Sequence, residues 1–119
     1  MIIEEALNQI IDDGIEACKL DYKDRPMELK GSVAGFEACR NKTPIELKEI
    51  LDTANQKTHQ AFLEQVDNYW EVRCFALEVE WVCNVLSAIL MNNGLPIIIP
   101  PTCRGILKAA DIVGVKELK

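Results

Sequence analysis

The longest apolar run of the chain, residues 69–91, most limits the folds that the chain can adopt. It reads YWEVRCFALEVEWVCNVLSAILM, and all four of its charged side chains lie in its first half. From Trp81 onward the run carries no charge. A helix that is apolar on every side must be covered on every side. The run therefore predicts a long central helix, over about residues 68–92, that the rest of the chain surrounds.

Two further helices are predicted before this run. Residues 2–20 carry apolar side chains three and four positions apart, which places them on one face of a helix. Pro26 suits the first turn of a second helix, because the N–H group that proline lacks would have no partner there. We expect this second helix to cover residues 26–40.

A third helix is predicted from a capping box. The side chain of Thr43 can accept a hydrogen bond from the backbone of Glu46, whose carboxylate can reach back to Thr43. We expect this helix over residues 44–65, because Asp and Asn at 67–68 give a new start signal before the central helix. One continuous helix over residues 44–92 is the alternative.

The chain after the central helix is rich in proline. Residues 95–101 contain three of the five prolines, which keep a segment out of a sheet interior, so we expect an extended strap there. A short C-terminal helix is expected over residues 103–113. The predicted fold class is all-α: a compact bundle of four to five helices around the central helix, forming a single domain over residues 1–119.

The first two predicted helices share a hexapeptide pattern. It reads GIEACK at 14–19 and GFEACR at 35–40. Glycine inside a helix costs about 1 kcal/mol relative to alanine, so two such glycines need compensation from close packing. We expect an antiparallel hairpin in which small residues of the two helices meet. Those residues are Ala6, Gly14 and Ala17 on the first helix and Gly31, Gly35 and Ala38 on the second. The alternative is that Glu16 and Glu37 form a carboxylate pair that binds a metal.

Composition and charge limit the partners. The net charge of −6 argues against nucleic acid and anionic lipid, which need clustered Lys and Arg. The uncharged part of the apolar run is shorter than the roughly 20 residues that cross a bilayer, so no membrane partner is expected. Five cysteines without a CxxC pair, and acidic residues where a signal peptide is basic, predict reduced thiols in a cytoplasmic protein.

The first candidate site is a polar pocket between helices. The charges of the apolar run have no opposite charge three or four residues away on their own helix, so their partners must come from elsewhere. The pocket would contain Arg73, Glu78, Glu80 and Asn84, with Arg40 as a partner from the second helix. An ordinary structural ion-pair network is the alternative.

The second candidate is a pair of acidic motifs, Glu46-x-x-Glu49 and Glu64-x-x-Asp67. This spacing resembles the ExxE and ExxD motifs of the all-α nucleoside-triphosphate pyrophosphohydrolases, in which carboxylates of two helices hold Mg²⁺ against substrate phosphates. The resemblance covers these four positions only. The family pattern has a further glutamate just before the first motif, where this chain has Ile45. A magnesium site and a nucleotide substrate are what the resemblance implies.

The third candidate is an anion site at the start of the expected C-terminal helix, formed by Thr102, Cys103, Arg104 and Gly105. A helix N-terminus offers free N–H groups and positive potential, which suit an anion and would lower the pKa of Cys103. Plain capping of the helix by Thr102 is the alternative.

The chain has no glycine-rich phosphate loop, nucleophile elbow or zinc-binding spacing. We therefore expect a protein-association or homo-oligomeric module without catalysis and without a cofactor, whose partner is itself, as a homodimer, or another protein. We expect its interface over the second half of the central helix, where cover is hardest to supply. The alternative function is a small-ligand binder or magnesium-dependent enzyme that uses interhelical carboxylates.

Overall fold

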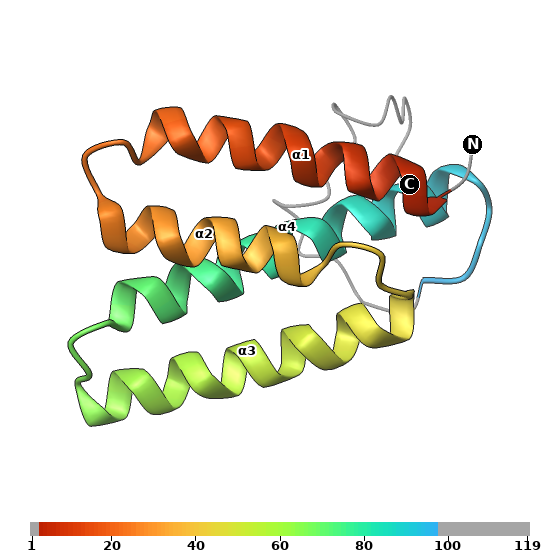
Figure 1. Ribbon diagram of the computed structural model, residues 1–119. Helices are drawn as coiled ribbons and strands as arrows, with labels where there is room; N and C mark the ends of the chain where they lie inside the picture. The colour runs from red at the N-terminus through yellow and green to blue at the C-terminus, as the bar shows by residue number, and fades with distance from the viewer. Residues whose placement is uncertain (1–2, 98–119) are drawn as a thin grey trace.

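The computed structural model of this protein describes residues 3–97. Four helices occur in this part of the chain (Figure 1). No strand occurs within that range, so the all-α prediction is confirmed. The expected C-terminal helix over 103–113, and the strap beyond Ile97, lie outside the described residues. The helices are α1 (Ile3–Asp21), α2 (Pro26–Ala38), α3 (Pro44–Glu64) and α4 (Tyr69–Asn92).

The predicted capping box starts α3. The backbone N–H of Glu46 donates to Thr43 Oγ1 at 3.2 Å, and the N–H of Thr43 donates to Glu46 Oε1 at 3.0 Å. Gln65, with φ of 52°, takes the left-handed conformation that ends α3. Residues 44–92 are therefore two helices, and the alternative of one continuous helix is wrong.

The predicted central position of α4 is confirmed. α4 packs against α1, α2 and α3, and most extensively against α2 and α3 (Figure 1). Every residue of its second half, from Val82 to Leu90, is buried. Burying one such aliphatic side chain stabilises the fold by roughly 1.5–3 kcal/mol relative to leaving it exposed. The interface predicted over this half is not available there, because it is already covered.

The small-residue seam lies between α2 and α4, and the seam predicted between α1 and α2 is wrong. A Cβ atom on Gly31 would collide with the backbone carbonyl oxygen of Glu71, and one on Gly35 would lie 2.6 Å from the carbonyl oxygen of Phe75. Two backbones that approach this closely leave no room for any side chain. On α1, Ala17 is exposed. Gly31 and Gly35 of α2 are needed where α2 faces α4, because α4 is the helix that the others must surround.

The two hexapeptides meet, although their glycines have different roles. Gly14 of the first lies under the aromatic ring of Phe36 of the second, and a Cβ on Gly14 would come within 2.6 Å of the Phe36 Cε1 atom. The ring is almost fully buried in the core. At the α1–α2 contact, therefore, a large aromatic side chain packs against a glycine.

Replacing Gly31 with alanine tests the α2–α4 contact. Gly31→Ala adds helix propensity worth about 1 kcal/mol but forces α2 away from α4, so we expect the free energy of unfolding to fall by about 2 kcal/mol. Denaturant unfolding followed by circular dichroism measures the change. Ala34→Ser, at an exposed position on the same helix, should leave the free energy within about 0.5 kcal/mol. A Gly31→Ala protein as stable as wild type would contradict the assignment.

Candidate functional sites

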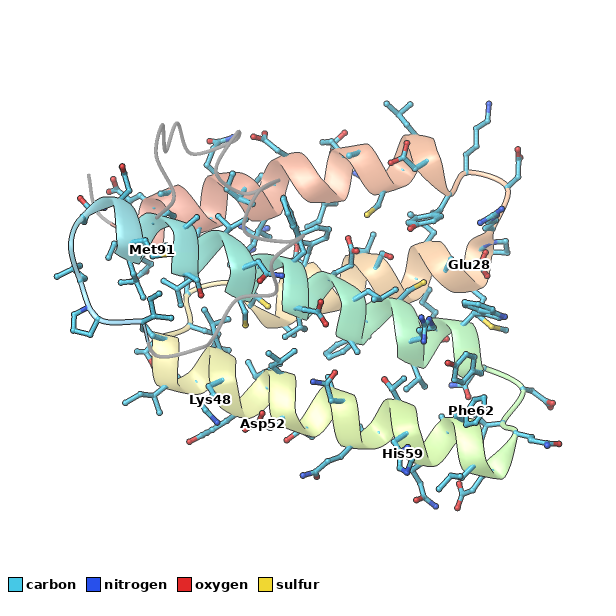
Figure 2. All side chains as sticks on the ribbon, turned by 180° about the vertical axis from the view of Figure 1, so that it is seen from behind. Glu28, Lys48, Asp52, His59, Phe62 and Met91 are labelled. Atoms are coloured by element: carbon cyan, nitrogen blue, oxygen red, sulfur yellow. The ribbon has the colours of Figure 1, made fainter. Side chains whose placement is uncertain are left out.

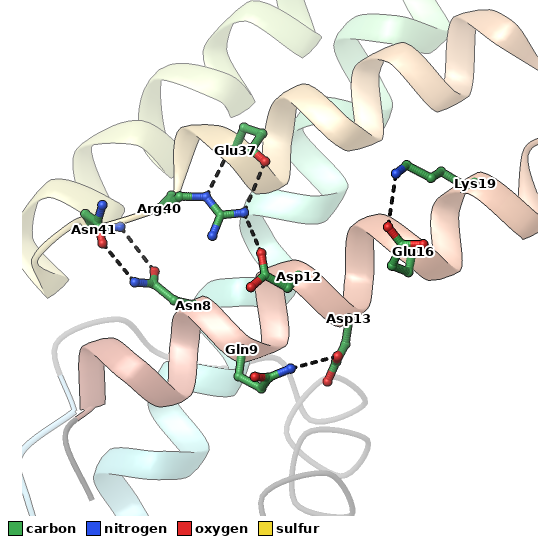
Figure 3. A network of polar contacts seen from close by, with 9 residues as sticks. All are labelled: Asn8, Gln9, Asp12, Asp13, Glu16, Lys19, Glu37, Arg40 and Asn41. Atoms are coloured by element: carbon green, nitrogen blue, oxygen red, sulfur yellow. Dashed lines mark hydrogen bonds and ion pairs between the residues drawn. The ribbon is translucent and has the colours of Figure 1, made fainter.

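The five residues of the predicted polar pocket do not come together. Arg40 is engaged at the α1–α2 hairpin, where its Nη2 donates to Asp12 Oδ1 at 2.7 Å and its Nε donates to Glu37 Oε2 at 3.0 Å (Figure 3). Arg73 Nη1 donates to the Tyr69 hydroxyl at 3.1 Å on α4 itself. Both cations have therefore found partners away from the expected pocket.

Helix geometry separates the remaining pocket residues. Successive residues of an α-helix are rotated by about 100°, so Glu78 and Glu80 point in nearly opposite directions from α4. Glu78 faces α1 and α2, and its Cβ lies 3.2 Å from the position that a Cβ on Gly35 would take. Asn84 is buried, one turn beyond Glu80. This separation could have been deduced from the sequence.

The alternative metal pair on the hexapeptides is not formed either. Glu16 Oε1 accepts from Lys19 Nζ at 3.0 Å, while Glu37 binds Arg40 (Figure 3). The hydrogen bonds from Arg40 lower the pKa of Glu37, more than its slight burial raises it. Both are exposed ion pairs of the kind that contribute little to stability. Each pair joins neighbouring turns within one part of the hairpin.

The two acidic motifs lie at opposite ends of α3. Glu46 is in the first turn of α3 and Glu64 is its last residue. At 1.5 Å per residue the two are roughly 27 Å apart, too far for one ion. Within residues 3–97, no group of three or more His, Cys, Asp or Glu side chains is placed to hold a metal. The two-helix geometry that the resemblance implies is therefore not present, and Glu46 serves as a capping residue.

The predicted anion site, Thr102 to Gly105, lies outside the described residues.

Glu78 instead belongs to a small buried cluster with two thiols and one hydroxyl. Its Oε2 accepts a hydrogen bond from the Cys18 thiol at 3.6 Å, across the α1–α4 contact. Burial raises the pKa of Glu78, and the thiol bond offsets part of that rise. Ser32 of α2 is fully buried, and its hydroxyl makes no hydrogen bond of ordinary geometry among residues 3–97.

The thiols of this cluster are poor nucleophiles. Burial, and then the charge of Glu78, raise the pKa of Cys18 to about 12. Burial also raises the pKa of Cys74, and it raises those of Cys39 and Cys83 to about 12. The thiolate is the reactive form of cysteine, so these groups are inert near neutral pH. All four of these cysteines are free and buried.

A continuous aromatic contact, which the site predictions missed, lies on the surface where α3 passes into α4. The ring centroids of Phe62 and Tyr69 are 6.1 Å apart, and those of Tyr69 and Trp70 are 5.4 Å apart. The guanidinium carbon of Arg73 lies 5.9 Å from the Trp70 ring centroid, a cation–π contact. The sequence did carry a signal, because five of the seven aromatic residues fall between positions 62 and 81.

This surface is largely open to solvent. The exposed fractions are 65% for Phe62, 61% for Leu63, 53% for Trp70 and 43% for Leu77. Beside it is a hollow of about 390 Å³ between α4 and the start of α2. We call the first feature the aromatic surface; it consists of Phe62, Leu63, Tyr69, Trp70, Arg73 and Leu77. We call the second the hollow; it is lined by Tyr22, Arg25, Glu28, Trp70, Cys74 and Leu77.

Among residues 3–97, only α4 is long and apolar enough to cross a membrane. Its most apolar stretch of 18 residues has a mean hydropathy of 1.6, and 67% of that stretch is buried inside the fold. The core helix of a soluble protein meets the same test. The expectation that the chain has no membrane partner therefore stays a prediction, which depends on the charges in the first half of α4.

Comparisons with known proteins add no relative to this description. No protein-family model, curated protein or solved structure matches the chain. What the chain does must therefore be inferred from its own contacts and chemistry.

The buried carboxyl of Glu78 predicts a pH-dependent effect of Glu78→Gln. Burial raises the pKa of Glu78 in the folded protein, so the wild type loses stability as the pH rises above the ordinary glutamate pKa, and the substitution should raise the free energy of unfolding at pH 7. Below the ordinary glutamate pKa of about 4.3, both states of the wild type are protonated and this advantage should vanish. It should grow as the pH rises through the raised pKa of the folded state.

Denaturant unfolding at pH 4 and pH 7 measures this difference. Glu16→Gln, at an exposed glutamate, is the matched control and should change the free energy by less than about 0.5 kcal/mol at either pH. A Glu78→Gln protein that is less stable than wild type at pH 7 would show that the ionised carboxylate is favoured where it lies.

The raised thiol pKa values predict resistance to alkylation. In a Cys103→Ser variant, Cys18, Cys39, Cys74 and Cys83 should stay unmodified by iodoacetamide at pH 7.5 in native buffer and react completely in denaturant. Mass spectrometry of the intact protein counts the modified thiols. Rapid modification of any of them in the native protein would be inconsistent with the buried cluster.

Proposed function

We propose that the chain is a protein-association module without catalysis, and that the aromatic surface is its interface. The observation that carries this proposal is the unbroken contact of Phe62, Tyr69, Trp70 and Arg73, in which all but the partly buried Tyr69 are exposed. Tryptophan, tyrosine and arginine are the residue types that dominate the binding energy of protein interfaces. Here they are concentrated on one small part of the molecule.

The apolar area gives this surface a reason to be covered. An aromatic side chain buries about 150–250 Å² when fully enclosed, and each Å² of apolar area removed from water contributes about 25 cal/mol. Phe62 and Trp70 both keep more than half of their surface in water. Covering them together with Leu63 and Leu77 would supply a substantial part of the free energy of an association.

The surface is also held in one conformation before any partner arrives. The Tyr69 hydroxyl accepts a hydrogen bond from Arg73, and Trp70 contacts both the ring of Tyr69 and the guanidinium group. Side chains that are already ordered lose less conformational entropy on binding. Arg73 remains exposed, so it can pair with an acidic group of a partner.

The alternative of a magnesium-dependent enzyme has less support. Its acidic motifs lie at the two ends of α3, and the thiols near Glu78 have raised pKa values. The four free, buried cysteines are consistent with the reducing cytoplasm that we propose as the location.

Removing the central ring tests the proposal. Trp70→Ser should raise the dissociation constant of the homodimer about tenfold or more, the size of effect expected at an energetically central residue. Sedimentation equilibrium over a concentration series measures the constant. Ile45→Ser removes an exposed apolar side chain (64%, against 53% for Trp70) at the opposite end of α3, and should leave the dissociation constant unchanged.

Thermal melting of each variant shows whether it is folded. A wild-type chain that stays monomeric at every concentration would refute self-association. A dimer that is weakened equally by both substitutions would place the interface elsewhere.

A further inference from the structure

The aromatic surface contains a second hollow, at the turn where α3 passes into α4. Its lining consists of Ala61, Phe62, Leu63, Gln65 and Tyr69, and its volume is about 410 Å³. Figure 2 shows Phe62 at this end of the bundle. We call this space the turn hollow. Because three of its five lining residues are wholly apolar, it suits an apolar side chain better than a polar one.

The walls of the turn hollow are held by hydrogen bonds and by a ring contact. The N–H of Gln65 donates to the carbonyl oxygen of Phe62 at 3.3 Å, and the N–H of Val66 donates to that of Ala61 at 3.2 Å. The ring of Phe62 packs on the ring of Tyr69, with centroids 6.1 Å apart. A partner therefore meets walls that are already formed, which lowers the entropy cost of binding.

The charge at this turn is negative. Glu64 lies between two of the lining residues, Asp67 follows three positions later, and both side chains are exposed. Glu64 accepts a hydrogen bond from the amide of Gln60 at 2.7 Å, but within residues 3–97 neither carboxylate forms an ion pair. The stretch 58–72 contains no lysine or arginine. The two carboxylates are therefore not neutralised by the turn itself.

Arg73 is the cation of the aromatic surface, and it is engaged on the α4 side. Its Nη1 donates to the Tyr69 hydroxyl at 3.1 Å, and its guanidinium carbon lies 5.9 Å from the ring centroid of Trp70. In the described part of the chain it forms no ion pair with Glu64 or Asp67. Both carboxylates are thus available to cations of a partner.

We infer that the turn hollow binds a basic segment of another protein. That segment inserts an apolar side chain into the hollow and pairs its lysine or arginine side chains with Glu64 and Asp67. Apolar contact at the centre supplies affinity, and charges at the rim select the partner. The inference rests on the proposed function and names the chemistry of the partner at this part of the aromatic surface.

Charge selects a basic segment over a second copy as the occupant. A two-fold contact at this turn would bring Glu64 and Asp67 of both copies together, and like charges placed opposite one another oppose association. The whole chain also carries a net charge of −6, which repels another copy and attracts a basic segment.

Selection of random peptides displayed on phage tests the inference without assuming a sequence. The immobilised target is the whole 119-residue chain, and phage that also bind a Phe62→Ser chain are removed. We expect the enriched peptides to carry a net positive charge and an aliphatic or aromatic residue. Fluorescence anisotropy with the best peptide then gives its dissociation constant for each variant.

Two changes at the turn separate the apolar contact from the charged one. Phe62→Ser should raise the dissociation constant about tenfold or more, because it removes an apolar wall. The double variant Glu64→Gln with Asp67→Asn should raise it about fivefold, the effect of losing two exposed ion pairs. The second loss should shrink at high salt, because salt screens exposed charges.

Matched controls make the same changes elsewhere on the bundle. Ile45→Ser removes a side chain as exposed as that of Phe62, 64% against 65%, at the other end of α3. Glu49→Gln with Asp13→Asn neutralises two exposed carboxylates that form no ion pair among residues 3–97. Neither control should change the constant, and thermal melting shows that every variant is folded.

The outcomes separate this inference from the proposed function. Basic peptides that lose affinity with both changes at the turn and with neither control support it. Phe62-dependent peptides that are neutral or acidic overturn the basic partner and leave the aromatic surface as an interface. Basic peptides that the control pair weakens equally show general attraction to an acidic chain, which overturns the inference. If no peptide depends on Phe62 the inference also fails, and the effect of Trp70→Ser on the homodimer decides the proposed function separately.

Discussion

The close approach of α2 to α4 at Gly31 and Gly35 is the contact on which the rest of the structure depends. Because no Cβ atom stands between the two backbones, α2 lies directly on the first half of α4. Ser32, which follows Gly31, is thereby fully buried, and Glu78 comes against Gly35. The cluster of hydroxyl, thiols and carboxyl is a consequence of this contact. A larger residue at either glycine would separate the helices and expose all of these groups.

The buried cluster shows how the fold accommodates a carboxyl group in a largely apolar region. Glu78 receives a weak hydrogen bond from a thiol, and its pKa rises because burial disfavours the charge. The same burial raises the pKa of Cys18, and Glu78 raises it further. Glu78 therefore favours the neutral thiol of Cys18, whereas the hydrogen bond from that thiol favours the ionised form of Glu78. This part of the core is therefore sensitive to protonation. It is not a reactive centre, although it places buried cysteines beside a carboxyl group.

The two halves of α4 have different surroundings. One half supplies stability, and the other contributes to the proposed interface. Residues 82–90 are buried and supply the core. Residues 69–77 alternate between core contacts, such as Cys74, and exposed side chains, such as Trp70 and Leu77. Hydrophobicity alone would locate an interface in the more apolar half. The fold covers that half completely and leaves Trp70 and Leu77 exposed in the half that also carries charge.

Local signals in the sequence determined the helices, because caps and prolines act within a few residues of themselves. The Thr43 and Glu46 capping box, Pro26 at the first position of α2, and the wholly apolar second half of α4 were sufficient to predict where helices start and which of them is central. Tertiary structure decided everything that depends on which helix a side chain faces. Gly31 turned toward α4 instead of α1, and Arg40 and Arg73 found separate partners. Those outcomes follow from the rotation and register of whole helices, which short-range patterns do not specify.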